Sequence, residues 1–564
     1  MATSLRILLI TGEQSFNEIQ QIANKVNGEK DLNIHCEIRM VSVDVSAFIT
    51  PEHVTELCIP FTEENYDFAL IPGFTTWDSS ILKDKIQIPV YKGTRFSGDL
   101  YDLLCHIREL KLPTKKAADH LLQTRSRQKI QEYVENLGET FFTQGQPISG
   151  SRVLQFVTPN GRRILTGGDF PPLLFAEIVD APKLSESEIM EKVHYYMDSG
   201  ANVIDIGMIF GQSHPDLIRK IVPKIKNTCD ILVSIDSVRI DEIVAGIESD
   251  VDIILSIDGE NIDSFLEYSE NHQIKRDLGI VLIPLDGPNH TAIENPTAKA
   301  EFLISLAKNL RNHGFNNIFY DSLLKNPISP GLMDSLHCYY IHNEIVQQQP
   351  EIYYPTFMGL HNVFELVDAD SSGMISLLSL IASELNCAGI FTTEFSPKTL
   401  GSIRETRKSI DFAYFAKISK SPPTSLGLDA FFVKSKRRSL SRTEEPSIIL
   451  NLHTNEISQE NLKELISPDD KFIHDTTGYF KIYINHLTRL IEVIFIPFDE
   501  TKKRLNLTGP LLLKGRSAEH LYKTIHQLGL VTEISHAFYL GKELSKAEYA
   551  LHVNAPYFED TELE

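Results

Sequence analysis

The sequence predicts an α/β protein with a central TIM (β/α)8 barrel, flanked by an N-terminal doubly wound α/β domain and a C-terminal α+β domain. Three observations predict this architecture. Apolar, β-branched runs alternate with helical segments over most of the chain, as they do in parallel sheets. Eight of these runs fall within ~220–250 residues, which is the span of one barrel. Towards the C-terminus the regular alternation stops, and strand-like and helical stretches follow in mixed order.

The composition limits the classes of function. A chain of 564 residues is long enough for about three or four domains. Its 42% hydrophobic and 23% charged residues can form folded cores. The formal net charge of -22 disfavours nucleic acid as a partner, because phosphate binding needs a basic surface. No apolar run reaches the ~18 residues of a membrane span, so we expect no membrane partner.

The cysteines and the N-terminal run indicate a cytoplasmic protein. The six cysteines are scattered and form no CxxC pair, which suits a reducing compartment and predicts neither a disulfide framework nor a zinc site. The opening stretch MATSLRILLITGEQ has a short apolar run without a small-residue cleavage site. It predicts a first strand rather than a signal peptide.

Residues 1–140 are predicted to form a Rossmann-like or flavodoxin-like α/β domain. Four strand-like runs, RILLITG, HCEIRMVSV, DFALIPG and IPVYKG, alternate with polar helical stretches, which predicts a small doubly wound sheet. The first loop, TGEQSFNE, has neither a GxGxxG fingerprint nor a Walker lysine, so it indicates a nucleotide site only weakly. Residues 143–172 are rich in Gly, Pro and Thr and predict a connector.

Residues 150–416 are predicted to form the barrel. Helical patterns such as SESEIMEKVHYYMDSG separate most of its apolar runs. The fifth and seventh units are the least regular, and a long doubly wound sheet is the competing architecture. The eight runs are LLFAEIV (173–179), NVIDIG (202–207), DILVSID (230–236), VDIILSI (251–257), GIVLIPL (279–285), NIFYDS (317–322), PTFMGL (355–360) and AGIFTTE (388–394).

Residues 428–564 are predicted to form the α+β domain. A second connector, KISKSPPTSLG (417–427), precedes it. The strand-like runs PSIILNL and KIYINH are followed by the helical stretches SAEHLYKTIHQLG and ISHAFYLGKELSKAEYAL. This order, strands and then helices, is typical of an α+β fold.

Polar side chains stand at or just after the ends of all eight predicted strands. In a barrel these ends form the mouth, where the active sites of this fold lie. No Lys or Arg stands at any of the eight ends, which carry Glu177, Asp205, Asp236, Asp258, Asp286, Asp321, Asn362 and Glu394. Burying an unpaired carboxylate is costly, and this many acceptors on one rim therefore predict a ligand that brings donors.

A helix cap and a metal cluster are the competing roles for these residues. A strand-end Asp often only caps the helix that follows it, and this could hold at any single position. The HxH pattern of hydrolytic metal barrels is missing, and His361 is the only histidine near these ends, so we expect no metal. A pterin suits the rim better, because its 2-amino group and ring N–H groups offer a donor edge that a carboxylate can bind twice.

Five motifs in order resemble the pterin-binding barrel superfamily, which contains dihydropteroate synthase and the methyltetrahydrofolate:corrinoid methyltransferases. They are SGANVIDIG (199–207), VSIDS (233–237), LSIDGEN (255–261), IFYDSLLKNP (318–327) and MGLHNV (358–363). Over nearly its full length the chain is similar to archaeal-type dihydropteroate synthase-related proteins, including their ending HAFYLGKELSKAEYAL.

The resemblance implies roles for five residues. Asp236 matches the Asp that holds the donor edge of the pterin, and Asp321 matches the second pterin-binding Asp. Asp205 lies in the same pocket. Asn362 falls where the methyltransferases have GLSN, whose asparagine acts near N5 of the pterin as the methyl group leaves. Glu177 stands where the methyltransferases begin their first strand with a Gly-Glu pair. The resemblance thus implies Asn362 and Glu177 as catalytic residues.

The sequence departs from both families. The phosphate-binding elements of dihydropteroate synthase are replaced by EIVDAP (177–182), FGQSHPD (210–216) and GLHN (359–362), which lack its Arg and Lys. Binding a diphosphate leaving group needs such donors, so condensation with p-aminobenzoate is disfavoured. The NSIS motif of the methyltransferases reads LSID here. Ser256 and Asp258, which stand in this motif, are expected to contact the pterin. Alternatively, the changed motif suits a pterin with different substituents, such as a methanopterin.

The sequence therefore predicts a pterin-dependent transferase of one-carbon metabolism. Its cofactor would be a reduced pterin of the tetrahydrofolate or tetrahydromethanopterin type, and methyl or one-carbon transfer is preferred. The resemblance admits a partner protein that carries a corrinoid, and a homodimer. Two alternatives remain: condensation as in dihydropteroate synthase, and a non-catalytic pterin-binding subunit that kept Asp236 and Asp321 but lost the chemistry.

Overall fold

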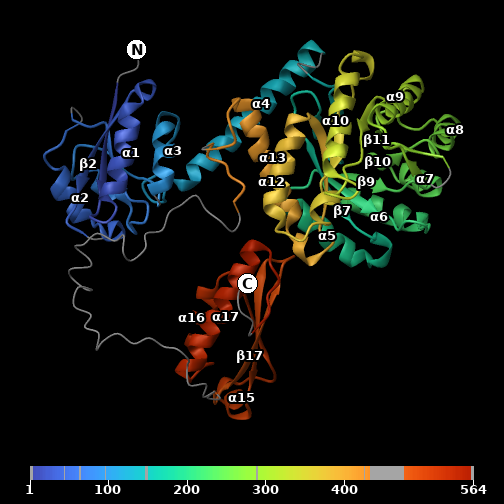
Figure 1. Cartoon of the computed structure of the whole chain (residues 1–564). Coiled ribbons are helices and arrows are strands. Elements are labelled where there is room, and N and C mark those ends of the chain that lie inside the picture. The colour runs from blue at the N-terminus through green and yellow to red at the C-terminus, as the bar shows by residue number, and fades with distance from the viewer. Residues whose placement is uncertain are drawn as a thin grey trace. The chain divides into compact units, whose positions relative to one another are not determined.

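A computed structural model describes residues 4–43, 45–62, 65–95, 97–145, 150–287, 290–424, 426–431 and 475–559. The chain divides into two compact units, one built around Met1–Gln131 and the other around Glu132–Lys420 (Figure 1). The second unit also holds the described residues 475–559. In the described part of the chain, no helix has the length and apolarity that crossing a membrane requires.

The first unit contains a four-stranded parallel sheet in the order β2-β1-β3-β4. Alternate residues of β1 face two different cores, Ile7 and Leu9 on one side and Leu8 and Ile10 on the other. Helices therefore cover both faces, as predicted for a doubly wound sheet. The elements are β1 (Leu5–Thr11), α1 (Phe16–Gly28), β2 (Ile34–Met40), α2 (Pro51–Cys58), β3 (Phe68–Ile71), β4 (Val90–Lys92) and α3 (Leu100–Cys105). The long helix α4 (Asp119–Gln144) begins in the first unit and ends in the second.

The second unit contains a closed barrel of eight parallel strands in chain order. The last strand pairs with the first, Thr393 beside Glu177, and this closes the sheet. The predicted barrel is confirmed, and the competing open sheet is wrong. The strands are β7 (Leu173–Ile178), β8 (Val203–Gly207), β9 (Leu232–Asp236), β10 (Ile253–Ile257), β11 (Gly279–Leu282), β14 (Asn317–Tyr320), β15 (Thr356–Gly359) and β16 (Cys387–Thr393).

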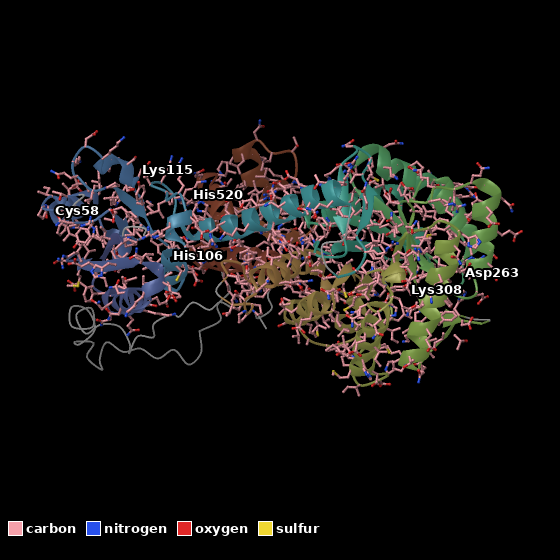
Figure 2. All side chains as sticks on the ribbon, turned by 90° about the horizontal axis from the view of Figure 1, so that it is seen from above. Cys58, His106, Lys115, Asp263, Lys308 and His520 are labelled. Atoms are coloured by element: carbon pink, nitrogen blue, oxygen red, sulfur yellow. The ribbon has the colours of Figure 1, made fainter. Side chains whose placement is uncertain are left out.

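Amphipathic helices surround the barrel. In α6 the buried residues Ile218, Ile221, Val222 and Ile225 recur at helical spacing and form one apolar stripe. Asp263 on α8 and Lys308 on α9 are exposed and point away from the strands (Figure 2). The helices are α5 (Glu186–Asp198), α6 (Pro215–Thr228), α7 (Ile240–Glu248), α8 (Ile262–His272), α9 (Pro296–Asn312), α10 (Leu332–Val346), α11 (His361–Phe364), α12 (Ser371–Glu384) and α13 (Ser402–Ser419). A short antiparallel ribbon, β12 (Leu285–Asp286) with β13 (Thr291–Ala292), follows β11.

Residues 143–172, predicted as a connector, contain the hairpin β5 (Leu154–Val157) and β6 (Arg163–Thr166). Phe156 from this hairpin stacks on Phe319 at 6.2 Å inside the barrel. Thr166 Oγ1 donates to the carbonyl of Ala388 at the start of β16. The hairpin thus closes the amino-terminal end of the barrel. The Asn160–Gly161 pair in its turn is the hairpin signal, which the Gly, Pro and Thr composition masked.

Aromatic side chains fill the barrel below its mouth. Phe175 lies 4.9 Å from Phe357 and 6.2 Å from Phe319, measured between ring centroids. Gly389 leaves room for this packing, because a Cβ there would lie 2.3 Å from the ring of Phe357. The interior is a packed core rather than a channel, so chemistry is confined to the carboxyl ends of the strands.

The described C-terminal residues form an antiparallel sheet and three helices. Burial alternates strictly along β18, as in a sheet with one covered face. KIYINH lies largely within β17, whereas PSIILNL, the first of the two predicted strands, falls outside the described residues. The elements are β17 (Gly478–Asn485), β18 (Leu490–Pro497), α15 (Asp499–Leu505), β19 (Leu511–Gly515), α16 (Ala518–Gln527) and α17 (Ile534–Val553).

Candidate functional site

The carboxyl ends of the barrel strands lie at one mouth, and strand register decides which side chains point into it. Glu177 on β7 is paired with Asp205 on β8, and Asp205 is paired with Ser234 on β9. Asp236 stands two residues further along β9, beside Gly207. Side chains two residues apart on a strand share a face, and paired positions in neighbouring strands do too. These side chains therefore all point into the barrel.

Four carboxylates come together there. One oxygen each from Glu177, Asp205 and Asp236 lies within 4.8 Å of the others. Asp321 follows β14 directly, and its charge raises the pKa of Asp236. Gly207 permits this approach, since a Cβ at that position would lie 2.4 Å from Glu177 Oε1. We call the carboxylates of Glu177, Asp205, Asp236 and Asp321 the acidic ring.

Few donors reach the acidic ring from the described residues. Ser234 Oγ donates to Asp205 Oδ1 over 2.5 Å, and Tyr339 OH donates to Asp321 Oδ1 over 2.6 Å. The backbone N–H of Leu323 donates to the same Asp321 oxygen at 2.8 Å. Asp205 Oδ2 is buried and has no hydrogen-bond partner within the described ranges. Because a buried acceptor without a donor costs free energy, this geometry favours a ligand that supplies donors.

Burial and mutual repulsion favour protons on the acidic ring near neutral pH. Burial, and then the charge of Asp321, raises the pKa of Asp236 to about 7. Burial raises the pKa of Asp321 to about 6, although hydrogen bonds to this carboxyl act in the opposite direction. The pKa values of Glu177 and Asp205 lie well above their usual range, first through burial and then through neighbouring carboxylates.

The acidic ring has three chemical uses. It can share protons among its carboxyl groups, bind the donor edge of a molecule, or hold a divalent cation. The spacing of Glu177, Asp205 and Asp236 is compatible with a cation, although the sequence predicts no metal. A donor-bearing ligand and a cation would both displace protons from the ring as they bind.

Replacing Asp205 by asparagine is expected to stabilise the ligand-free protein more at pH 8 than at pH 5. Burial, and then the charge of Asp236, raises the folded-state pKa of Asp205, so its favourable contribution is complete below the unfolded pKa and is lost as pH rises through the folded pKa. The neutral asparagine has no such dependence on pH.

Thermal unfolding of both proteins at pH 5 and pH 8 measures this difference. Asp286→Asn is the matched control, because Asp286 is an exposed strand-end carboxylate outside the acidic ring. It should change the melting temperature at neither pH. Equal destabilisation of Asp205→Asn at both pH values would instead assign Asp205 a packing role through its hydrogen bond with Ser234.

Asn362 and His361 lie beside the mouth, on the short helix α11 that follows β15. A Cβ at Gly359 would lie 3.3 Å from Asn362 Nδ2 and 3.1 Å from His361 Cε1, so the glycine lets both side chains fold over the strand end. Burial lowers the pKa of His361 to about 4. Its imidazole is therefore neutral, and its buried Nδ1 has no hydrogen-bond partner in the described part of the chain.

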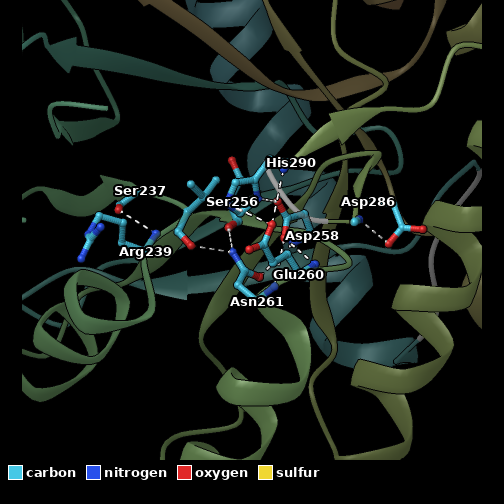
Figure 3. A network of polar contacts seen from close by, with 10 residues as sticks. Ser237, Arg239, Ser256, Asp258, Glu260, Asn261, Asp286 and His290 are labelled. Carbon is cyan, nitrogen blue, oxygen red and sulfur yellow. Dashed lines mark hydrogen bonds and ion pairs between the residues drawn. The ribbon is translucent and has the colours of Figure 1, made fainter. Parts of the chain in front are cut away.

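Asp258 has its own hydrogen-bond network, shown in Figure 3. Its Oδ1 accepts from the N–H groups of Glu260 at 2.9 Å and Asn261 at 3.1 Å. Its Oδ2 lies 2.5 Å from His290 Nδ1. Both oxygens are thus engaged in the turn that precedes α8, a local structural role rather than a helix cap. Direct contact of Asp258 with a pterin stays a prediction.

Ser256 and Asp286 flank this network (Figure 3). Ser256 is buried, and its carbonyl accepts from Asn261 Nδ2 at 3.0 Å. Asp286 is exposed on β12, where its Oδ1 accepts from the N–H of Gly287 at 2.9 Å. The predicted pterin contact of Ser256 also stays a prediction.

Glu394 faces away from the mouth. Thr393, not Glu394, is in register with Glu177, and adjacent residues on a strand point to opposite faces. Glu394 Oε1 instead accepts from the hydroxyl of Tyr195 at 3.5 Å and from the N–H of Ile403 at 3.3 Å. The prediction that Glu394 belongs to the rim is therefore wrong.

Three polar residues at the mouth are not predicted from the sequence. Ser234 could have been found, because it stands two residues before Asp236 and shares its face. Thr393, whose buried Oγ1 has no hydrogen-bond partner among the described residues, becomes visible only once the register of β16 is known. Tyr339 comes from α10, and no local pattern connects it with Asp321.

Two family models match parts of the chain. Residues 179–325 match the model of the pterin-binding enzymes, and residues 474–560 match a model described as PterinBD-DUF4346. The first match includes Asp205, Asp236 and Asp321. An uncharacterized protein of Methanocaldococcus jannaschii is 27% identical over 572 residues, which cover 100% of each chain.

Solved structures of dihydropteroate synthases are similar to part of the chain. The Yersinia pestis enzyme in complex with a sulfonamide drug is 13% identical, covers 47% of this chain and 100% of its own, and has a TM-score of 0.37. The Coxiella burnetii enzyme in complex with pteroic acid is 15% identical, covers 46% of this chain and 98% of its own, and has a TM-score of 0.35.

Proposed function

We propose that this protein is a pterin-binding enzyme, a transferase that acts on a reduced pterin, and the match of residues 179–325 to the model of the pterin-binding enzymes supports this. The pterin is of the tetrahydrofolate or tetrahydromethanopterin type, and the group transferred is a methyl or another one-carbon unit. The acceptor is a corrinoid on a partner protein. The single observation that carries the proposal is the acidic ring.

The acidic ring supports a pterin because it offers acceptors and few donors. Asp236 and Asp321 bind the donor edge, that is, the 2-amino group and the ring N–H groups. The neighbouring carboxylates of Asp205 and Glu177 keep the pocket acceptor-rich, and the protons that the ligand displaces from the ring pass to solvent. Charge-assisted hydrogen bonds of this kind are about twice as strong as neutral ones, which favours the pterin over apolar rings of the same size.

Asn362 and Glu177 are the residues proposed to act on the transferred group. The amide of Asn362 is a donor at the rim of the mouth and can stabilise charge that develops near N5 as the methyl group leaves. Burial, and then the neighbouring carboxylates, raise the pKa of Glu177, which favours its protonated form, and this proton can be passed on through the acidic ring. His361, with its lowered pKa, contributes a neutral imidazole beside them.

Condensation with p-aminobenzoate is the second candidate. The observation in its favour is that the loop after β9 carries a cation, Arg239, which could meet a diphosphate. However, Arg239 Nε is engaged with Asp241 Oδ1 at 3.2 Å. The loop 210–216 carries no arginine. Methyl transfer, which has no diphosphate leaving group, fits this charge distribution better.

The affinity for a reduced pterin is expected to fall by about tenfold per pH unit below pH 7. The donor edge needs Asp236 in its ionised form, and this carboxyl has a pKa of about 7. Protons therefore compete with the ligand on the acid side, and affinity levels off on the alkaline side. Calorimetric titration with 5-methyltetrahydrofolate between pH 6 and pH 8.5 measures the profile. A flat profile would remove Asp236 from the binding site.

Two parallel turnover assays, with three possible outcomes, distinguish the candidate reactions. The protein is incubated with 5-methyltetrahydrofolate and reduced cobalamin, and separately with a pterin diphosphate and p-aminobenzoate. Methylation of the cobalamin supports the proposal. Formation of a dihydropteroate contradicts it and supports condensation. Tight binding without product in either assay contradicts it as well and assigns the chain the role of a pterin-binding subunit.

A further inference from the structure

A cavity of about 290 Å³ lies at the carboxyl edge of the sheet in the N-terminal unit. It is lined by the ends of β1 and β3, which are neighbours in the sheet. From β1 the chain enters α1 on one face, and from β3 it continues to Leu82 in the core of the opposite face. Strand connections that diverge in this way leave a crevice at the carboxyl ends, where doubly wound sheets bind ligands.

One side of this cavity carries a cluster of hydroxyl groups. Ser46 Oγ lies 2.7 Å from Ser15 Oγ and 3.2 Å from Thr11 Oγ1, and it accepts from the N–H of Gly12 at 2.9 Å. The fold brings together two segments here, the β1–α1 connection with Thr11 and Ser15 and the loop with Ser46. Gly12 is needed for this approach, because a Cβ there would lie 2.6 Å from the carbonyl of Val43.

The same side of the cavity holds the start of α1. Ser15 is its N-cap residue, and its side chain caps no N–H of the helix. The first N–H groups of a helix have no partner within the helix and favour an anion. Together with the hydroxyl cluster they form a donor-rich end of the cavity.

Apolar side chains form another part of the cavity wall. They include Ile19, Leu100 and Phe74, of which Phe74 is 46% exposed. Among the described lining residues, charge comes from Glu18 and from Arg95, whose Nε is engaged with Asp119 at 3.3 Å. The cavity thus combines neutral donors with apolar side chains. It lacks the strong positive charge that a polyphosphate would need.

We propose that this cavity binds a mononucleotide-like molecule, that is, a flat ring that carries one phosphate. The phosphate lies against the hydroxyls of Thr11, Ser15 and Ser46 and the start of α1. The ring packs on the apolar wall. The volume is at the lower end of the ~300–1,000 Å³ range of small-molecule pockets, which suits one nucleotide rather than a dinucleotide. This site is independent of the acidic ring in the barrel.

Matched ligand pairs test the proposal on the full chain. FMN is compared with riboflavin, and AMP with adenosine, by calorimetric titration. In at least one pair, the phosphorylated member is expected to bind about tenfold more tightly or better, the scale of one or two hydrogen bonds to a charged group.

Ser46→Ala is expected to weaken the binding of the phosphorylated ligand by about tenfold and to leave the binding of the matching dephosphorylated ligand unchanged. Ser15→Ala provides a second variant in case Ser46 is needed for folding. Thr55→Ala is the control, because this hydroxyl on α2 donates to the carbonyl of Pro51 and does not line the cavity. Asp236→Asn, in the barrel, should also leave this binding unchanged. Equal affinity within both pairs, no binding of FMN or AMP, or full affinity in both serine variants would overturn the proposal.

Discussion

Replacing Asp236 by asparagine is expected to weaken the binding of a reduced pterin by about 2–4 kcal/mol, or ~30- to 1,000-fold. The substitution turns one acceptor oxygen into a donor that faces the donor edge of the pterin. The fold should survive, since the substitution also removes a charge from four mutually repelling carboxylates. Calorimetric titration at pH 8, where the native carboxyl is largely ionised, measures the loss, and thermal unfolding checks the fold.

Two strand-end carboxylates serve as controls for this experiment. Asp286→Asn changes an exposed carboxylate and should alter neither affinity nor melting temperature. Asp258→Asn changes a carboxylate that accepts from two N–H groups in the turn before α8. It should lower the melting temperature, and a loss of affinity as well would support the predicted pterin contact of Asp258. If Asp236→Asn lowered the melting temperature and left affinity unchanged, Asp236 would have a structural role and the proposed pterin contact would be lost.

Replacing Asn362 by alanine is expected to slow methyl transfer ~10²-fold, the scale of one preorganised donor, while pterin affinity changes only a few fold. The amide interacts with charge that develops near N5 only as the bond to the methyl group breaks. Interactions that exist in the transition state but not in the ground state affect turnover more than binding. Affinity, single-turnover rate and melting temperature should be measured on the same preparation.

Two further variants sharpen this prediction. Asn362→Lys places a cation where a condensing enzyme would need one, and it should still not bind a pterin diphosphate, because the loop 210–216 has no arginine. His361→Phe replaces a neutral, buried imidazole and tests whether α11 contributes more than Asn362. An Asn362→Ala variant with full turnover would exclude this residue from the reaction. A variant that loses stability and affinity together would show that Asn362 only orders the loop after β15.

The local sequence was sufficient to predict the strands of the barrel and most of the polar residues at its mouth. Each of the eight predicted runs contains most or all of one barrel strand, because β-branched residues between helical segments can only be buried as parallel strands. Asp205 and Asp236 could be predicted for the same reason. A carboxylate at the end of such a strand lies at the mouth. It points into the barrel when it stands two residues from another interior-facing residue of the same strand.

Only the tertiary structure decided which of these polar groups meet. Glu394 and Thr393 are neighbours in sequence, and the pairing of β16 with β7 places Thr393 on the interior face beside Glu177. Tyr339 reaches Asp321 from a helix, and His290 binds Asp258 across 32 residues. The hydroxyl of Ser46 likewise meets those of Thr11 and Ser15 from a distant segment. Sequence patterns show only which face of a single segment is buried. Strand register and helix docking depend on how whole segments pack against one another, and this packing decides which side chains meet.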